Sequence, residues 1–180
     1  MADDTELIAA LSVIQQRGAI GEKSLVDAIR HADRFVALIP PGRRSVIDLG
    51  SGGGLPALVI CCRRPDLTVM MVERRATRAD LLRRAVASLR LGERSMVVTA
   101  DVGTVCTDTD RRFDVVTARS FADVATTVRF IDLLLAPGGI GLVSEPPADR
   151  SDVWTSCLEH HPSLRDEGAH QGVRRLRRES

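Results

Sequence analysis

The chain has 180 residues, of which 44% are hydrophobic and 27% charged, and its formal net charge is only +1. This length predicts one domain with a substantial core. A helix that crosses a bilayer needs about 20 apolar residues in a row, and no apolar run in this chain approaches that length. The near-neutral charge creates no overall positive field, so any binding of nucleic acid must be local. Aromatic residues make up 3% of the chain and tyrosine is absent, which leaves few side chains for stacking unpaired bases.

The four cysteines, at positions 61, 62, 106 and 157, have no C-x-x-C spacing, so we expect no metal site. The N-terminus, Met-Ala-Asp-Asp-Thr-Glu, is acidic and lacks the apolar core of a signal peptide. We therefore expect a cytoplasmic protein with reduced cysteines and no membrane partner.

Two amphipathic helices open the chain. Apolar residues recur at helical spacing between positions 7 and 14, and glycines at 18 and 21 end that segment. A second apolar stripe begins after a capping pair formed by Ser24 and Asp27, and it stops before Pro40-Pro41. We expect residues 1–41 to form a helical cover beside a sheet.

A strand predicted at residues 46–49 runs directly into four glycines within five residues, and an apolar helix is expected at 55–62. Glycine lets a ligand approach the backbone without meeting a Cβ atom. Dinucleotide-binding folds use G-x-G-x-x-G at such a turn to bind a pyrophosphate. Here Gly50, Gly52 and Gly54 are spaced G-x-G-x-G and follow Asp48. This spacing favours a ligand bound through amino and carboxylate groups.

Strands and helices alternate through the rest of the chain. Further strands are expected at residues 68–72, 96–99, 113–120 and 140–144, with helices at 77–89 and 122–135. The first of these helices is expected to be capped by Thr77 and Asp80, and residues 103–112 to be mostly loop. Beyond residue 151 we expect a short helix around Trp154, a turn, and a closing strand or tail at 173–178.

This alternation predicts an α/β fold with a doubly wound, mostly parallel sheet and right-handed crossovers. Residues 42–180 would hold that sheet and form one compact unit with the N-terminal cover.

Three charged residues follow predicted strands, at the sheet edge where open α/β folds bind ligands. Glu73 lies about twenty residues after the glycines and can accept both hydroxyls of a ribose; the alternative is a solvent-facing acid. Asp101 is either a ligand contact or a cap of a turn or helix. Arg119 is either a ligand contact or half of a structural ion pair.

Asp48-Leu49-Gly50-Ser51-Gly52-Gly53-Gly54-Leu55-Pro56 resembles the loop of class I S-adenosylmethionine (SAM) methyltransferases. Its Leu-Pro ending, together with Phe113-Asp114-Val115-Val116-Thr117-Ala118-Arg119-Ser120, resembles the RsmG/GidB family, and the resemblance covers residues 24–144. It implies a Rossmann-like fold, SAM as cofactor, and methyl transfer to N7 of a guanine in 16S ribosomal RNA. The implied partner is ribosomal RNA or the small ribosomal subunit.

The same resemblance implies roles for individual positions. Asp101 would accept from N6 of the adenine, and Arg119 would face the carboxylate of SAM or a substrate phosphate. The implied substrate-binding residues are Arg119, Arg78 and His31. The implied cofactor-binding residues are Asp48, Gly50, Ser51, Gly52, Gly54, Leu55, Glu73, Arg74, Asp101, Val102 and Arg119.

The chain departs from the family pattern at several places. Arg34-Phe35 replaces an Asp-Ser, Thr77 replaces a basic residue, and Glu145 follows the fifth strand where the family has Lys. For Arg78 a solvated helix start, and for His31 an ordinary half-buried histidine, stay open as alternatives. The arginines at 174–178 are either phosphate ligands or a solvated tail.

Transfer of a methyl group to N7 of guanine needs alignment and no general base, because that nitrogen has a lone pair and no proton to lose. We therefore assign no catalytic residue. Two alternatives keep SAM: a methyltransferase with a small-molecule acceptor, and a non-catalytic SAM-binding paralogue. A nicotinamide-dependent oxidoreductase is disfavoured by the glycine spacing.

Overall fold

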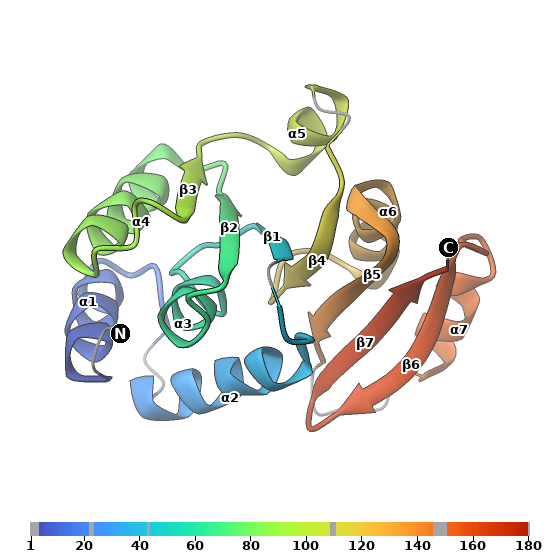
Figure 1. Cartoon of the computed structure of the whole chain (residues 1–180), viewed down its shortest axis with the longest axis horizontal. Helices are drawn as coiled ribbons and strands as arrows, with labels where there is room; N and C mark the ends of the chain where they lie inside the picture. The colour runs from blue at the N-terminus through green and yellow to red at the C-terminus, as the bar shows by residue number, and fades with distance from the viewer. Residues whose placement is uncertain (1–3, 22–23, 43, 109–110, 146–150, 180) are drawn as a thin grey trace.

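The computed structural model describes residues 4–21, 24–42, 44–108, 111–145 and 151–179. Its centre is a seven-stranded sheet in the order β3-β2-β1-β4-β5-β7-β6 (Figure 1). The first five strands pair in parallel and the last two pair antiparallel, so the predicted doubly wound, mostly parallel sheet is confirmed. The strands are β1 Arg44–Leu49, β2 Leu67–Val72, β3 Ser95–Val98, β4 Phe113–Ala118, β5 Leu135–Ser144, β6 Leu164–His170 and β7 Val173–Arg178.

Helices cover both faces of the sheet. Successive residues of a strand point to opposite faces, and here the side chains on both faces are apolar and buried. Val46 packs in a core cluster with α1 to α4, and its neighbour Ile47 packs in a second cluster with α5 to α7. The helices are α1 Asp4–Gln16, α2 Leu25–Leu38, α3 Ala57–Arg63, α4 Ala76–Ser88, α5 Val102–Asp108, α6 Val124–Leu134 and α7 Ser151–Leu158.

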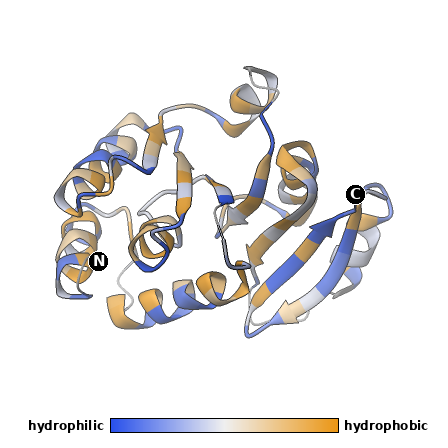
Figure 2. Cartoon of the chain, viewed as in Figure 1, coloured by the Kyte–Doolittle hydropathy of each residue, from blue (hydrophilic) through white to orange (hydrophobic). Residues whose placement is uncertain are grey.

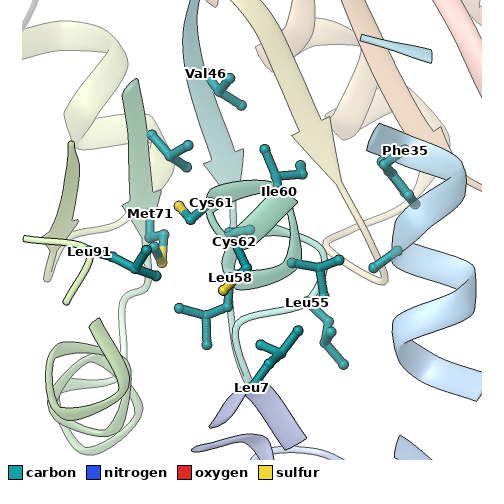
Figure 3. Close-up of a cluster of buried hydrophobic side chains, with 14 of the residues drawn as sticks. Leu7, Phe35, Val46, Leu55, Leu58, Ile60, Cys61, Cys62, Met71 and Leu91 are labelled. Carbon is teal, nitrogen blue, oxygen red and sulfur yellow. The ribbon is translucent and has the colours of Figure 1, made fainter. Parts of the chain in front are cut away.

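Helix α3 is the most deeply buried helix of the first cluster and directly follows the glycine loop. Leu58, Ile60, Cys61 and Cys62 lie between β1, β2 and α2 in Figure 3. Burial raises the pKa of the Cys61 thiol to about 12, so this cysteine is a small hydrophobic residue of the core. The end of β1 and the start of α3, on each side of the loop, are thus both buried in the core.

Helix α2 agrees with its predicted cap, and α4 does not. Ser24 Oγ accepts from the Asp27 amide at 3.4 Å, as expected of the capping pair. Helix α4 instead begins at Ala76, so the predicted Thr77 cap is wrong. Arg75 occupies the N-cap position and makes no side-chain cap bond there. Thr77 therefore lies within the first turn.

Two connections hold more regular structure than expected. Residues 102–108 form α5, whose start is supported by the Asp101 carboxylate, which accepts from the Gly103 amide at 2.8 Å. Strand β5 begins at Leu135 and not at 140. Leu135 already pairs with Phe113 of β4, and the register shifts over Pro137-Gly138-Gly139 before Ile140 pairs with Val115.

The closing strand expected at 173–178 is confirmed as β7, and β6 was not predicted. These two strands form a largely hydrophilic hairpin at the sheet edge (Figure 2). The arginines of β7 are not a solvated tail: Arg174, Arg175, Arg177 and Arg178 all pair with acidic side chains. No helix in the described part of the chain is long and apolar enough to span a membrane.

Candidate functional site

The glycine loop between β1 and α3 is tied to the neighbouring strand by Glu73. This side chain is only 5% exposed, so the alternative of a solvent-facing acid is wrong. Its Oε2 accepts from the Gly52 amide at 2.9 Å and its Oε1 from the Arg75 amide at 2.8 Å. A carboxylate can accept about four hydrogen bonds. Glu73 therefore positions the loop and retains acceptor capacity for a ligand.

The glycines of the loop do not all serve the same purpose. A Cβ atom on Gly50 would lie 2.7 Å from the Phe121 ring, so absence of a side chain there permits close packing. Gly52 has φ +53°, yet the nearest atom to its Cβ position is the Gly50 carbonyl oxygen at 3.6 Å. Gly52 thus borders open space, where a ligand can approach the backbone.

Asp48 lies beneath the loop and is 1% exposed. Thr117 Oγ1 donates to its Oδ1 at 2.6 Å, while its Oδ2 is buried without a hydrogen-bond partner among the described residues. Burial raises the pKa of Asp48 to about 6, against the opposing effects of the Thr117 and Ser51 hydroxyls and the Arg119 charge. Arg119 Nη1 is likewise buried and unpartnered. Both groups therefore have unused polar atoms next to the loop.

Three pockets meet at the carboxyl ends of the parallel strands. The β2 pocket, of about 490 Å³, lies between the loop, the start of α4 and the segment after β3. The β5 pocket, of about 640 Å³, lies between the ends of β4 and β5, α2 and α7. The loop pocket, of about 250 Å³, lies between the glycine loop and residues 19–21.

Ser120 and Phe121 join these pockets. Ser120 lines all three and has φ +52°, a strained conformation for a residue with a side chain. Phe121 lines both the β2 and the β5 pocket, and its ring contacts Phe130 edge-on at 5.9 Å between centroids. Phe121 and Ser120 therefore form a wall that the two larger pockets share.

The β5 pocket has a neutral polar side beside His31. Its Nε2 lies 3.0 Å from Ser144 Oγ, and burial, followed by the charges of Arg119 and Arg34, lowers the pKa of His31. His31 is thus a half-buried, uncharged imidazole at neutral pH that faces a site. Arg34 donates to the Gln171 carbonyl at 2.7 Å and Phe35 is fully buried, so both departures from the family pattern are structural here.

Glu145 and Trp154 also line the β5 pocket. Arg174 Nε donates to Glu145 Oε1 at 2.6 Å, and the same guanidinium also bonds Asp166. It lies 5.0 Å from the centre of the Trp154 ring. The acid that replaces the family's Lys is therefore neutralised by a buried arginine from β7. Residues 146–150, which follow Glu145, lie outside the described residues.

The structure brings most of the predicted residues together. The β2 pocket collects Gly50, Glu73, Arg74, Arg78, Asp101 and Val102. The loop pocket collects Gly50, Ser51, Gly52, Leu55, Arg78 and Arg119. Arg119 and His31 line the β5 pocket, whereas Asp48, below the loop, and Gly54, at its end, line none of the three. The exposed Asp101 makes the capping bond to Gly103 described above, as its alternative reading expected.

Sequence reasoning missed Ser120, Phe121, Ser144 and Trp154 as site residues. The first two directly follow Arg119, so extending the strand-end argument by two positions would have found them. Ser144 is the last residue of the predicted fifth strand and was open to the same argument. Trp154 lies in α7, and nothing in the sequence around it indicates that it lines a pocket. Its position depends on packing against the β6–β7 hairpin.

A mostly parallel sheet with pockets at its carboxyl edge defines a Rossmann-like fold of the class I methyltransferase type. A methyltransferase from Geobacter sulfurreducens superposes with a TM-score of 0.68 at 15% identity, over 100% of this chain and 91% of that one. A SAM-dependent O-methyltransferase from Thermotoga maritima gives 0.67 at 14% identity, over 84% and 65%.

A family model described as rRNA small subunit methyltransferase G matches residues 8–147, and the chain belongs to this GidB family. Ribosomal RNA small subunit methyltransferase G from Acidothermus cellulolyticus is 38% identical over 129 residues, 69% of this chain and 55% of that protein. The protein of the same name from Acidiphilium cryptum is 28% identical over 171 residues, 89% and 75% of the two chains. The chain thus spans about half the length of the first of these relatives. The predicted family is confirmed.

Proposed function

We propose that the protein is a SAM-dependent methyltransferase that methylates N7 of a guanine in small-subunit ribosomal RNA. One observation carries the proposal: two pockets at the carboxyl edge of the sheet lie side by side and share Ser120 and Phe121 in their walls. Such an arrangement suits a cofactor on one side and an acceptor on the other. The names of the family and its relatives support ribosomal RNA as the acceptor.

The β2 and loop pockets fit SAM. Glu73 has acceptor capacity left for ribose hydroxyls, and Gly52 offers open space beside the backbone. Asp101 and Val102 would contact the adenine, while Arg119 would face the carboxylate in the loop pocket. Arg74 borders the ribose side, and Asp48 has an unpartnered oxygen below the loop. SAM, when bound, supplies a methyl group on a positively charged sulfur.

The β5 pocket fits a purine base. Its volume of about 640 Å³ lies within the ~300–1,000 Å³ range of ligand pockets. Phe121 is half-buried and offers an aromatic surface, and a base withdrawn from its RNA stack can lie against such a side chain. Trp154 is 1% exposed and supports the wall of the pocket. His31 and Arg119 supply polar contacts beside it. The protein's task is to hold N7 toward the β2 pocket and to exclude water.

Residues 1–41 would serve as a cover on this unit, since α1 and α2 share a core cluster with α3 and α4. The chain would act in the cytoplasm, on ribosomal RNA or on the small ribosomal subunit.

The test is transfer of labelled methyl from SAM to small ribosomal subunits from cells that lack this chain, followed by nucleoside analysis. Label in 7-methylguanosine is the expected result. G52V is the matched control, because a branched side chain at the open face should abolish SAM binding and transfer together.

SAM binding without transfer to this RNA would overturn the ribosomal acceptor and favour a small-molecule acceptor or a non-catalytic role. Failure of the unmodified protein to bind SAM would overturn the proposal as a whole.

A further inference from the structure

We propose that a groove between α1 and α4 binds the phosphate backbone of the RNA. The inference rests on the proposed function and extends it beyond the base pocket. Figure 1 shows α1 and α4 side by side, and the two helices are in contact. The groove between them, of about 450 Å³, is called the arginine groove. It is lined by Arg17, Gly18, Arg75, Thr77, Arg78, Asp80, Leu81 and Arg84.

The arginines of this groove have no acidic partners among the described residues. Arg17, Arg75, Arg78 and Arg84 take part in none of the ion pairs, nor does Arg74 beside them. The one acid that lines the groove is Asp80, and it is bonded to Arg83 at 2.7 Å.

The arginines of β7 present the opposite case, because Arg174, Arg175, Arg177 and Arg178 are all paired with acids. In a chain with a net charge of +1, the groove is thus a local concentration of uncompensated positive charge.

Arg74, Arg75 and Arg78 outnumber the one acid, Glu73, that accepts from a backbone amide at the start of α4. Arg74, Arg75 and Arg78 lie at the N-terminus of α4, whose first turn contains no acid and whose N-cap makes no side-chain bond. A helix N-terminus has partial positive charge, so cations there are destabilising and anions are stabilising. A bound phosphate reverses this effect, and phosphates commonly bind at helix N-termini. The arrangement therefore points to an anionic ligand.

The groove shares lining residues with the pockets of the proposed methyl-transfer site. Arg78 lines the groove, the β2 pocket and the loop pocket, and Arg75 lines the groove and the β2 pocket. Thr77, which stands where the family has a basic residue, also lines the groove. Arg17 lines the groove from the α1 side and supplies positive charge there. Several arginines in one groove match the repeated phosphates of a nucleic acid strand. A ligand with one carboxylate, such as SAM, would need fewer of them.

The experiment compares two double variants that remove the same charge. R17A/R84A changes arginines that line the groove and neither the β2, the β5 nor the loop pocket. R90A/R165A removes two exposed arginines elsewhere: Arg90 pairs with Glu6 near the end of α4, and Arg165 lies in β6. Affinity for deproteinised small-subunit ribosomal RNA is measured across a series of KCl concentrations, with SAM affinity and thermal unfolding measured in parallel.

We expect R17A/R84A to reduce the slope of log affinity against log salt by about 1.5, since each lost phosphate contact removes about 0.7 to 0.9. RNA affinity at low salt should fall at least about tenfold, with SAM affinity unchanged. R90A/R165A should keep the wild-type slope.

An equal slope in both double variants would overturn the groove while leaving the methyltransferase proposal intact. Weaker SAM binding by R17A/R84A, with an unchanged RNA slope, would assign the groove to the cofactor and would also overturn the inference. Absence of RNA binding by the unmodified protein would overturn both proposals.

Discussion

The carboxyl group of Asp48 combines burial with an incomplete set of hydrogen bonds. Its pKa is raised to about 6, so the folded protein binds this proton more tightly than the unfolded chain does. Its contribution to the free energy of unfolding is therefore fully present below the unfolded pKa of about 4. It is lost as the pH rises through about 6, which is the reverse of an acid held in an ion pair.

The variant D48N should remove this pH dependence. Relative to the wild type, its free energy of unfolding should increase between about pH 4 and pH 7, by on the order of 2–3 kcal/mol. Urea unfolding of both proteins at several pH values measures the difference, and other titrating groups cancel in it. A difference that does not vary with pH would show that Asp48 has an ordinary pKa in the folded protein.

At the scale of one element, Gly52 and Gly53 of the glycine loop should respond differently to the same substitution. A Cβ atom on Gly53 would lie 2.2 Å from Ile20 Cγ1 and 2.8 Å from the Ala19 carbonyl oxygen, so the connection after α1 must shift. G53A should therefore lower the free energy of unfolding by about 1–3 kcal/mol.

At Gly52 an added methyl group meets open space, and only the positive φ opposes it, at a cost of roughly 1–2 kcal/mol. G52A should therefore lose SAM affinity out of proportion to its loss of stability. Thermal unfolding and calorimetric SAM titration of both variants measure the two effects. The same ratio of the two losses in both variants would contradict this division of roles.

The elements that could be predicted from sequence are those with a local physical signal. Residues 46–49 form a buried strand before glycines, and Ser24 with Asp27 satisfies helix amides within one turn, so neighbours alone specify them. Strand β6 lacks such a signal because its sequence is charged and contains Gly168. It exists through its pairing with β7, which acts across the sheet.

The same distinction holds for the site. Glu73 and Arg119 follow strands and could be placed at the carboxyl edge from topology alone. The first turn of α4 was misread because Thr77 is a good capping residue, whereas Glu73 binds the Arg75 amide and the helix begins one residue before Thr77. The burial of Trp154 against Arg174 depends on α7 and β7 together, and no single segment encodes it.

For the whole molecule, Arg174 connects the terminal hairpin to the β5 pocket. It is 7% exposed, bonds Glu145 and Asp166, and packs on Trp154. R174A would leave the Glu145 carboxylate, whose side chain is 13% exposed, without its cation, and breaking such a buried pair costs about 3–5 kcal/mol. We expect a large fall in melting temperature, measured by calorimetry.

R165A, in the neighbouring strand, is the matched control, since exposed substitutions usually change stability by no more than about 0.5 kcal/mol. Equal melting temperatures for R174A and R165A would show that the hairpin does not depend on this ion cluster.

Trp154 determines the intrinsic fluorescence of the protein. It is the sole tryptophan of the chain, and tyrosine is absent, so intrinsic fluorescence excited above the phenylalanine band comes from one indole ring. That ring lines the β5 pocket. The emission of the unlabelled protein therefore comes from the wall of that cavity, and a change in it would follow the arrival of a base and the departure of the product in real time.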